Sequence, residues 1–138
     1  MTATARDLLA QKNSAVVYTC SPDATVAEAS RMLRERRVGC LVVVVAGEVA
    51  GVLSEREVTR AVAEGLDPAR ARVQDVMVRG VPSAALETPA AEVERTLRAL
   101  HLHHLPVVGE RGLLGVVSLG DLARFHAARE RAAERATG

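Results

Sequence analysis

The sequence predicts an α/β (α+β) fold built from two tandem copies of one small unit. Gly51-Val52-Leu53-Ser54 recurs as Gly115-Val116-Val117-Ser118, which is a spacing of 64 residues (115 − 51). The same spacing relates Glu28 to Glu92, and the two halves align without a gap. Each half also places β-branched runs between stretches of helical periodicity. We therefore expect two β-α-β-β-α repeats that pack with pseudo-two-fold symmetry into one globular module.

The first half contains signals for a strand, a helix, a hairpin and a second helix. Thr25 and Glu28 form a possible capping box, which marks the start of the first helix. Gly47-Glu48 lies between two β-branched runs, as a tight hairpin turn would. The strand is expected at residues 15–20, the hairpin at 40–46 and 49–53, and the second helix at 54–64.

The second half repeats this order. Pro89 suits the first turn of its first helix. A strand is expected at residues 81–86, a hairpin at 105–108 and 113–117, and a helix after it. Two shorter segments lie outside the repeats: a helical stretch at 73–77 and an opening segment, Arg6-Asp7-Leu8-Leu9. We divide the chain into residues 1–64 (first repeat with the N-terminal segment), 65–80 (connector) and 81–138 (second repeat with the C-terminal helix).

Composition argues against several classes of function. The net charge is +1 and aromatic residues make up 1%, so neither phosphate attraction nor base stacking supports nucleic-acid binding. No apolar run approaches the length of a membrane helix, and the N-terminus has no signal-peptide pattern. We expect a cytoplasmic protein that binds neither nucleic acid nor membrane. The nearly all-arginine basic complement suggests a bacterial source.

The sequence shows no assembled catalytic or metal motif. It has no P-loop, no nucleophile elbow and no dinucleotide-binding glycine pattern, so we do not expect an enzyme. His101, His103 and His104 are spaced poorly for a shared metal ion, and no acidic ligand accompanies them. Cys20 and Cys40 are expected to be buried, inert thiols rather than a redox pair.

Several segments, taken in order and occurring twice, resemble the CBS-domain family. The resemblance covers nearly the entire chain and is to a CBS pair, or Bateman module, of the stand-alone bacterial type. The segments that carry it are 23–29, 39–44 and 51–57 in the first half, and 75–77, 103–108 and 115–121 in the second.

This resemblance implies an adenosine ligand in a cleft edged by the start of a second helix. The expected ligand is AMP, ADP or ATP, with NAD(H) or S-adenosylmethionine as less favoured choices. Asp121 would accept hydrogen bonds from the ribose hydroxyls and Ser118 would donate to a phosphate, beside the backbone amides of the helix start. Adenine would lie between Ser83 and the segment His104-Leu105-Pro106.

The first half departs from the family pattern. Glu57 stands where aspartate is usual, and the extra methylene moves the carboxylate by about 1 Å, which matters for ligand positioning. We therefore rank the cleft of Ser118 and Asp121 above that of Ser54 and Glu57. Arg56 is expected to contact a phosphate. Thr19 and Cys40 complete the candidates in the first half.

Two functions remain open from the sequence. The first is a regulatory nucleotide sensor without catalytic activity, which signals to an unknown effector protein. The second is a ligand-free module that dimerises and scaffolds a partner, because a capping box needs no ligand to explain it. In either case we expect a homodimer through the second helices of the repeats, with contacts from Ala61, Val62, Leu122, Ala123 and Phe125.

Overall fold

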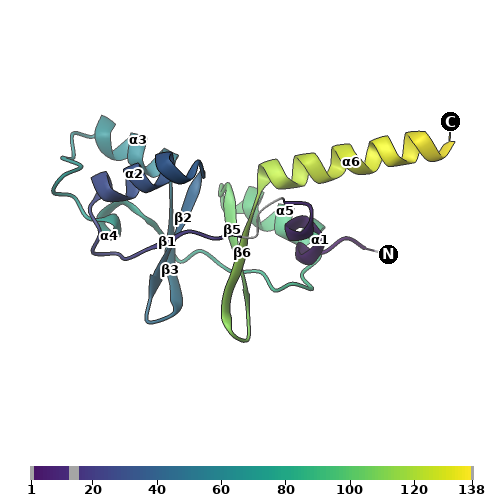
Figure 1. Cartoon of the computed structure of the whole chain (residues 1–138), viewed down its shortest axis with the longest axis horizontal. Coiled ribbons are helices and arrows are strands. Elements are labelled where there is room, and N and C mark those ends of the chain that lie inside the picture. The colour runs from purple at the N-terminus through teal and green to yellow at the C-terminus, as the bar shows by residue number, and fades with distance from the viewer. Residues whose placement is uncertain (1, 13–15, 138) are drawn as a thin grey trace. The chain divides into compact units, whose positions relative to one another are not determined.

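A computed structural model describes residues 2–12 and 16–137 of the chain, without the side chain of residue 137. The expected mixed α+β class with two repeated sets of elements is confirmed (Figure 1). The elements are α1 (Ala5–Ala10), β1 (Thr19–Cys20), α2 (Val26–Arg36), β2 (Cys40–Val45), β3 (Glu48–Ser54), α3 (Glu55–Ala63), α4 (Val73–Val76), β4 (Val78–Arg79), α5 (Ala90–Ala99), β5 (His104–Gly109), β6 (Gly112–Ser118) and α6 (Leu119–Thr137).

The chain divides into two compact units. Residues 17–82 form the first unit, and residues 83–138 together with the N-terminal residues up to 16 form the second. The N-terminal segment, assigned above to the first repeat by its place in the sequence, thus packs with the second. No helix within the described residues is both long and apolar enough to cross a membrane.

The first unit has a four-stranded sheet in the order β1-β2-β3-β4. β1 runs parallel to β2, while the β2–β3 and β3–β4 pairs are antiparallel. Side chains from both strands of the hairpin, from α2 and from the connector form its core, because alternate strand residues face the same side. The members of this core are Ala29, Leu33, Leu41, Val43, Leu53, Val73 and Met77.

The second unit has the corresponding hairpin, β5–β6, but the strand predicted at residues 81–86 is reduced to one bridge, between Ala84 and Val107. In the first unit the backbone N–H of Val42 donates to Tyr18 O. The residue equivalent to Val42 is Pro106, which has no N–H to donate, so the parallel ladder cannot extend here.

The turn of the first hairpin lies one residue earlier than predicted. Ala46 and Gly47 are its central residues, with φ of 51° and 83°, and β3 already begins at Glu48. Both central residues of a tight hairpin turn adopt positive φ because this backbone twist matches the twist of the strands. The prediction of Gly47-Glu48 as the turn is therefore wrong by one position.

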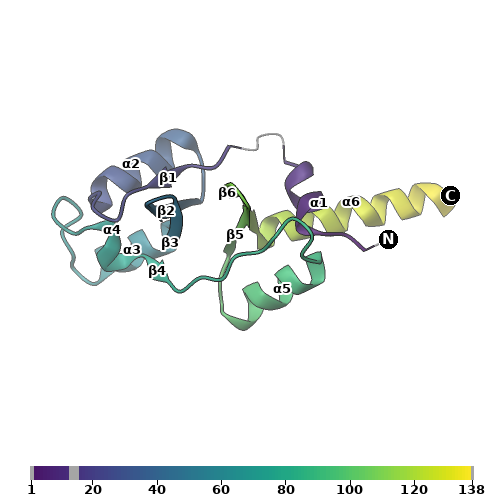
Figure 2. The same ribbon diagram turned by 90° about the horizontal axis from the view of Figure 1, so that it is seen from below.

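The N-terminal segment (residues 3–9) is the structural counterpart of connector residues 71–77, at a spacing of 68 (71 − 3). Each segment begins a short helix with the same capping contact, in which a backbone N–H donates to the aspartate three residues later: Thr4 to Asp7 at 2.8 Å, and Arg72 to Asp75 at 2.9 Å. Each then packs on its own unit. α4 contacts α3, whereas α1 contacts β6, α5 and α6 (Figure 2).

The backbone hydrogen bonds of the two segments also correspond. Each segment accepts one N–H from the start of the first long helix of its unit, α2 or α5, and donates two to the turn before that helix. In the first unit these bonds are Val26 N to Ala71 O at 2.9 Å, Val73 N to Ala24 O at 2.8 Å and Gln74 N to Pro22 O at 3.0 Å. In the second they are Ala90 N to Ala3 O at 2.9 Å, Ala5 N to Thr88 O at 2.8 Å and Arg6 N to Leu86 O at 2.9 Å.

Each segment, or the residue directly after it, also lies close to one glycine of a strand. A Cβ on Gly51 would come within 2.5 Å of the backbone oxygen of Val78, whereas a Cβ on Gly115 would meet Leu9 Cδ2 at 2.7 Å. Backbone cannot move aside as easily as the end of a leucine side chain.

We expect Gly51→Ala to lower the free energy of unfolding by about 2 kcal/mol and Gly115→Ala by about 1 kcal/mol or less, measured by urea denaturation. An equal or larger loss for Gly115→Ala would contradict this account.

Candidate functional site

The junction of β6 and α6 holds a reciprocal pair of hydrogen bonds between Ser118 and Asp121. Ser118 N donates to Asp121 Oδ2 at 2.9 Å, and Asp121 N donates to Ser118 Oγ at 3.0 Å. This capping arrangement satisfies two backbone donors at the start of the helix. Asp121 is only 1% exposed. These contacts hold a buried carboxylate beside a hydroxyl at the N-terminus of α6.

Two cations reach this carboxylate. Lys12 Nζ lies 3.0 Å from Asp121 Oδ2, and the guanidinium of Arg124 pairs with Oδ1. Burial alone would raise the pKa of Asp121, but the hydrogen bond and charge of Lys12, the Ser118 N–H and Arg124 outweigh burial and hold that pKa below its usual value. Asp121 is thus ionised at neutral pH.

Gln11 and Lys12, which follow the N-terminal segment, make two further contacts here. Lys12 Nζ also donates to Val116 O at 2.7 Å, and Gln11 Nε2 donates to Asp121 O at 2.7 Å. Sequence reasoning missed both residues, because they lie more than 100 positions from their partners. One signal was available: Lys12 is the only lysine in the chain.

His104 lies beside Ser118, its partner in the β5–β6 register. Burial is the main cause that lowers the pKa of His104, electrostatic interactions with His103 and Lys12 also lower it, and Asp121 opposes them, which together leave this pKa at about 4. The imidazole is therefore neutral at physiological pH, so one ring nitrogen can donate a hydrogen bond and the other can accept one.

The other candidates of the second half are placed as follows. Ser83 is exposed, whereas Leu105 and Pro106 are buried. Ala84 N donates to Pro106 O, and Val108 N donates to Ala84 O, both at 2.8 Å. The backbone at Pro106 is thus already tied to the segment that follows Ser83.

The first unit brings Ser54, Glu57 and Cys40 together in the same way. Ser54 N and Ser54 Oγ both donate to Glu57 Oε1 at 2.7 Å, and Cys40 faces Ser54 in the β2–β3 register. Glu57 is 8% exposed. Arg56 N donates to Ser54 Oγ at 3.2 Å, and the Arg56 side chain is exposed, as is Thr19 on β1.

Cys20 and Cys40 are both half-buried and form no disulfide with each other. Cys20 pairs with Val43 in the β1–β2 register, while Cys40 pairs with Ser54. Burial raises the pKa of Cys20 to about 11, which leaves this thiol protonated and unreactive at neutral pH. Across residues 2–12 and 16–137, no three histidine, cysteine or acidic side chains are grouped as metal ligands.

The outer faces of α3 and α6 differ from the dimer surface expected above. Ala61 and Leu122 are buried, at 3% and 2% exposure, because they belong to the inward faces of their helices. They are therefore unavailable for a contact with another chain. Val62 is 55% exposed and Phe125 is half-buried beneath Arg129, so a homodimer through these helices stays a prediction carried by Val62, Ala123 and Phe125.

The repeated units match one known domain twice. The family model of the CBS domain covers residues 4–64 and 73–128. The chain belongs to the CBS-domain family. It is similar to CBS domain-containing protein YhcV of Bacillus subtilis, at 32% identity over 78% of this chain and 76% of YhcV.

Solved structures share the fold of this CBS pair. A CBS-domain containing protein from Agrobacterium tumefaciens has a TM-score of 0.81 and 27% identity, over 90% of this chain and 99% of that one. The CBS domain pair of protein MJ0100, in complex with 5′-methylthioadenosine and S-adenosyl-L-methionine, has a TM-score of 0.81 and 21% identity over 94% of this chain and 99% of that one. CBS pairs are generally regulatory modules, and these matches indicate no catalytic family.

The low pKa of His104 makes the stability of this CBS pair depend on pH. Between pH 6.5 and about 4, residue 104 binds a proton in the unfolded chain but not in the folded one. The free energy of unfolding should therefore fall as the pH drops through this window, by at most about 1.4 kcal/mol per pH unit from this residue.

His104→Gln should remove the part of this fall in the free energy of unfolding that comes from residue 104. The midpoints of urea denaturation from pH 7 to pH 4.5 measure it. His101→Asn is a matched control, because His101 is exposed and Asn tolerates its φ of 55°. If both variants keep the full wild-type slope, His104 is not held neutral by the fold.

Proposed function

We propose that this CBS pair is a regulatory, non-catalytic sensor that binds an adenine nucleotide at Ser118 and Asp121. The observation that carries this proposal is the ionised carboxylate of Asp121, held at the start of α6 by the N–H of Ser118. An ionised carboxylate has about four acceptor positions and can receive both hydroxyls of a ribose. Few other ligand groups present two neighbouring hydrogen-bond donors to one buried carboxylate.

The groups around Asp121 favour a phosphorylated ligand. Ser118 Oγ accepts from the backbone, which leaves its hydroxyl proton free to be directed to a phosphate oxygen. Arg124 has a side chain that is 67% exposed, so its guanidinium can turn to a phosphate at little cost and bind it in a bidentate way. The amides at the start of the 19-residue helix α6 add to this positive field.

Neutral His104 supplies the remaining polar group of the proposed site. It can donate to or accept from an adenine edge without introducing a charge. The shared fold adds support, because the CBS pair of MJ0100 binds two adenosine derivatives. Of the adenosine ligands, AMP, ADP and ATP suit the arginine and the helix start better than the cationic S-adenosylmethionine does.

The first unit is proposed as the weaker site. Oε1 of Glu57 already accepts from both the backbone and the hydroxyl of Ser54, so this serine has no free proton for a phosphate in the described arrangement. In the second unit the serine hydroxyl proton is not used in this way. The difference follows from the longer side chain of glutamate, which folds back onto its own cap.

Calorimetric titration with AMP, ATP and S-adenosylmethionine tests the proposal. We expect AMP and ATP to bind more tightly than S-adenosylmethionine. Asp121→Asn keeps an acceptor for the Ser118 N–H but removes the charge, and should weaken AMP binding by about 10- to 100-fold. Glu57→Gln is the matched control and should have a smaller effect.

Absence of heat for every nucleotide at millimolar concentration would reject the sensor. A dimeric mass in light scattering under that condition would instead favour the ligand-free scaffold, since dimerisation does not need an occupied site. An equal loss of affinity in Asp121→Asn and Glu57→Gln would reject the ranking of the two sites.

A further inference from the structure

The hydrogen-bonding capacity of Asp121 is largely filled by the protein itself. Oδ2 accepts from Ser118 N and lies 3.0 Å from Lys12 Nζ, and Oδ1 pairs with Arg124. A carboxylate offers about four acceptor positions, so three of them are used. Turning of Arg124 to a phosphate would free Oδ1 but would leave Oδ2 with Ser118 N and Lys12. A ribose that places one hydroxyl on each carboxylate oxygen therefore also needs Lys12 to leave.

Lys12 is held more firmly than Arg124. Its side chain is 32% exposed against 67% for Arg124, and its ammonium also donates to Val116 O at 2.7 Å. The preceding residue strengthens the attachment, because Gln11 Nε2 donates to the backbone oxygen of Asp121 at 2.7 Å. These contacts join the end of α1 to both β6 and α6, at the point where the proposed ligand would need the carboxylate.

The first unit shows that the fold does not require this contact. The correspondence of residues 3–9 with residues 71–77 ends with the short helix, because the connector then continues as β4 beside β3, whereas the N-terminal chain continues toward Lys12. The three backbone hydrogen bonds that secure residues 3–9 have counterparts in residues 71–77, and the contacts of Lys12 lie outside this shared set. Lys12 is therefore an addition to a complete unit, placed on the half that carries aspartate rather than glutamate.

We propose that Lys12 is an intramolecular competitor that closes the Asp121 site, and that an adenine nucleotide must displace it to bind. This proposal rests on the proposed function. Displacement would free Gln11 and Lys12 while α1 stays attached through its backbone bonds to Leu86 and Thr88. Nucleotide binding would thus release these two residues. Molecules in which Lys12 occupies Asp121 would not bind the nucleotide, so the apparent affinity would fall as the fraction of such molecules rises.

The sign of a charge-removing substitution separates this role from direct ligand contact. Lys12→Met keeps a long apolar stem and removes the ammonium. Loss of a positive charge should by itself weaken the binding of an anion, so tighter AMP binding can only come from lost competition. We expect AMP to bind Lys12→Met about tenfold more tightly than wild type, by calorimetry at one pH and salt concentration.

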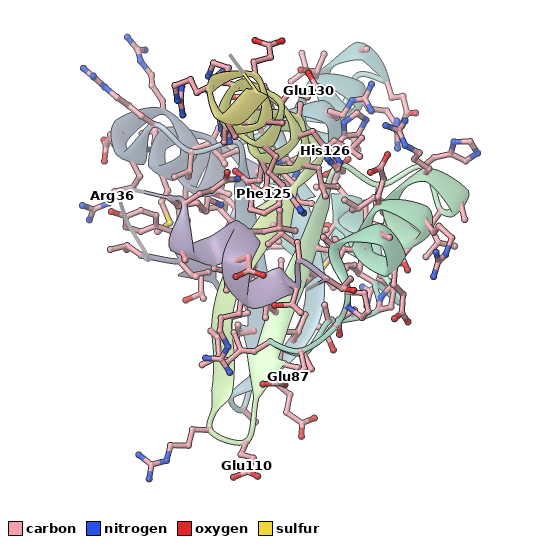
Figure 3. All side chains as sticks on the ribbon, turned by 90° about the vertical axis from the view of Figure 1, so that its right-hand side faces the viewer. Arg36, Glu87, Glu110, Phe125, His126 and Glu130 are labelled. Atoms are coloured by element: carbon pink, nitrogen blue, oxygen red, sulfur yellow. The ribbon has the colours of Figure 1, made fainter. Side chains whose placement is uncertain are left out.

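Arg6→Met is the matched control. Arg6 is a cation on the same segment, but it pairs with Glu87 at 2.9 Å on the segment that leads to α5, where Figure 3 labels Glu87. This variant should bind AMP as wild type does. Adding Asp121→Asn to Lys12→Met should abolish the gain, which assigns it to this site rather than to the first unit.

The same competition can be measured without a variant. Lys12 carries the only side-chain amine of the chain, so its acylation rate can be followed by peptide mass spectrometry separately from that of the N-terminal amine. Saturating AMP should raise the rate several-fold, because the ammonium leaves its two acceptors.

The outcomes are distinct. Unchanged or weaker AMP binding by Lys12→Met, or no rise in acylation when AMP is bound, overturns the competitor role while the nucleotide site stands. If AMP binds neither wild type nor Lys12→Met, the proposed function fails and the competition fails with it.

Discussion

The second unit depends on a segment from the opposite end of the sequence. Residues 3–9 cap, hydrogen-bond and pack on residues 84–125 in the manner in which residues 71–77 do on the first unit. Ala5 and Leu8 are fully buried, as is Val73 of the connector. A helix of six residues has no stability of its own, so α1 exists because these contacts hold it. In turn, α1 gives β6, α5 and α6 one more helix to pack against.

This dependence also explains why the two candidate sites differ. Attachment of the N-terminal segment brings Gln11 and Lys12 to the start of α6, where a buried aspartate needs a counter-charge. In the first unit Glu57 accepts from both the N–H and the hydroxyl of Ser54 instead. One small difference in side-chain length is therefore linked to a difference in how each site is closed. The sensor proposed above would respond mainly through its second half.

Local signals in the sequence predicted much of this structure, and long-range contacts account for what was missed. The repeat, the hairpins and the capping pairs at Ser54 and Ser118 follow from patterns within a few residues of each other. The reduction of the strand predicted at residues 81–86 to one bridge could not be predicted without knowing that it would pair beside Pro106. A missing backbone N–H prevents pairing only where a neighbouring strand would accept from it. Lys12 was missed for a related reason. Its role depends on where a segment docks, and spacing within the sequence carries no information on that.

Residue-resolved hydrogen exchange of Leu8→Ala and Val73→Ala tests the central claim most directly, because each substitution empties one buried position of one segment. We expect Leu8→Ala to reduce amide protection most in residues 84–125, and Val73→Ala to reduce it most in residues 17–82. Unchanged protection of residues 84–125 in Leu8→Ala, or a larger loss in residues 17–82 than there, would show that the N-terminal segment does not complete the second unit.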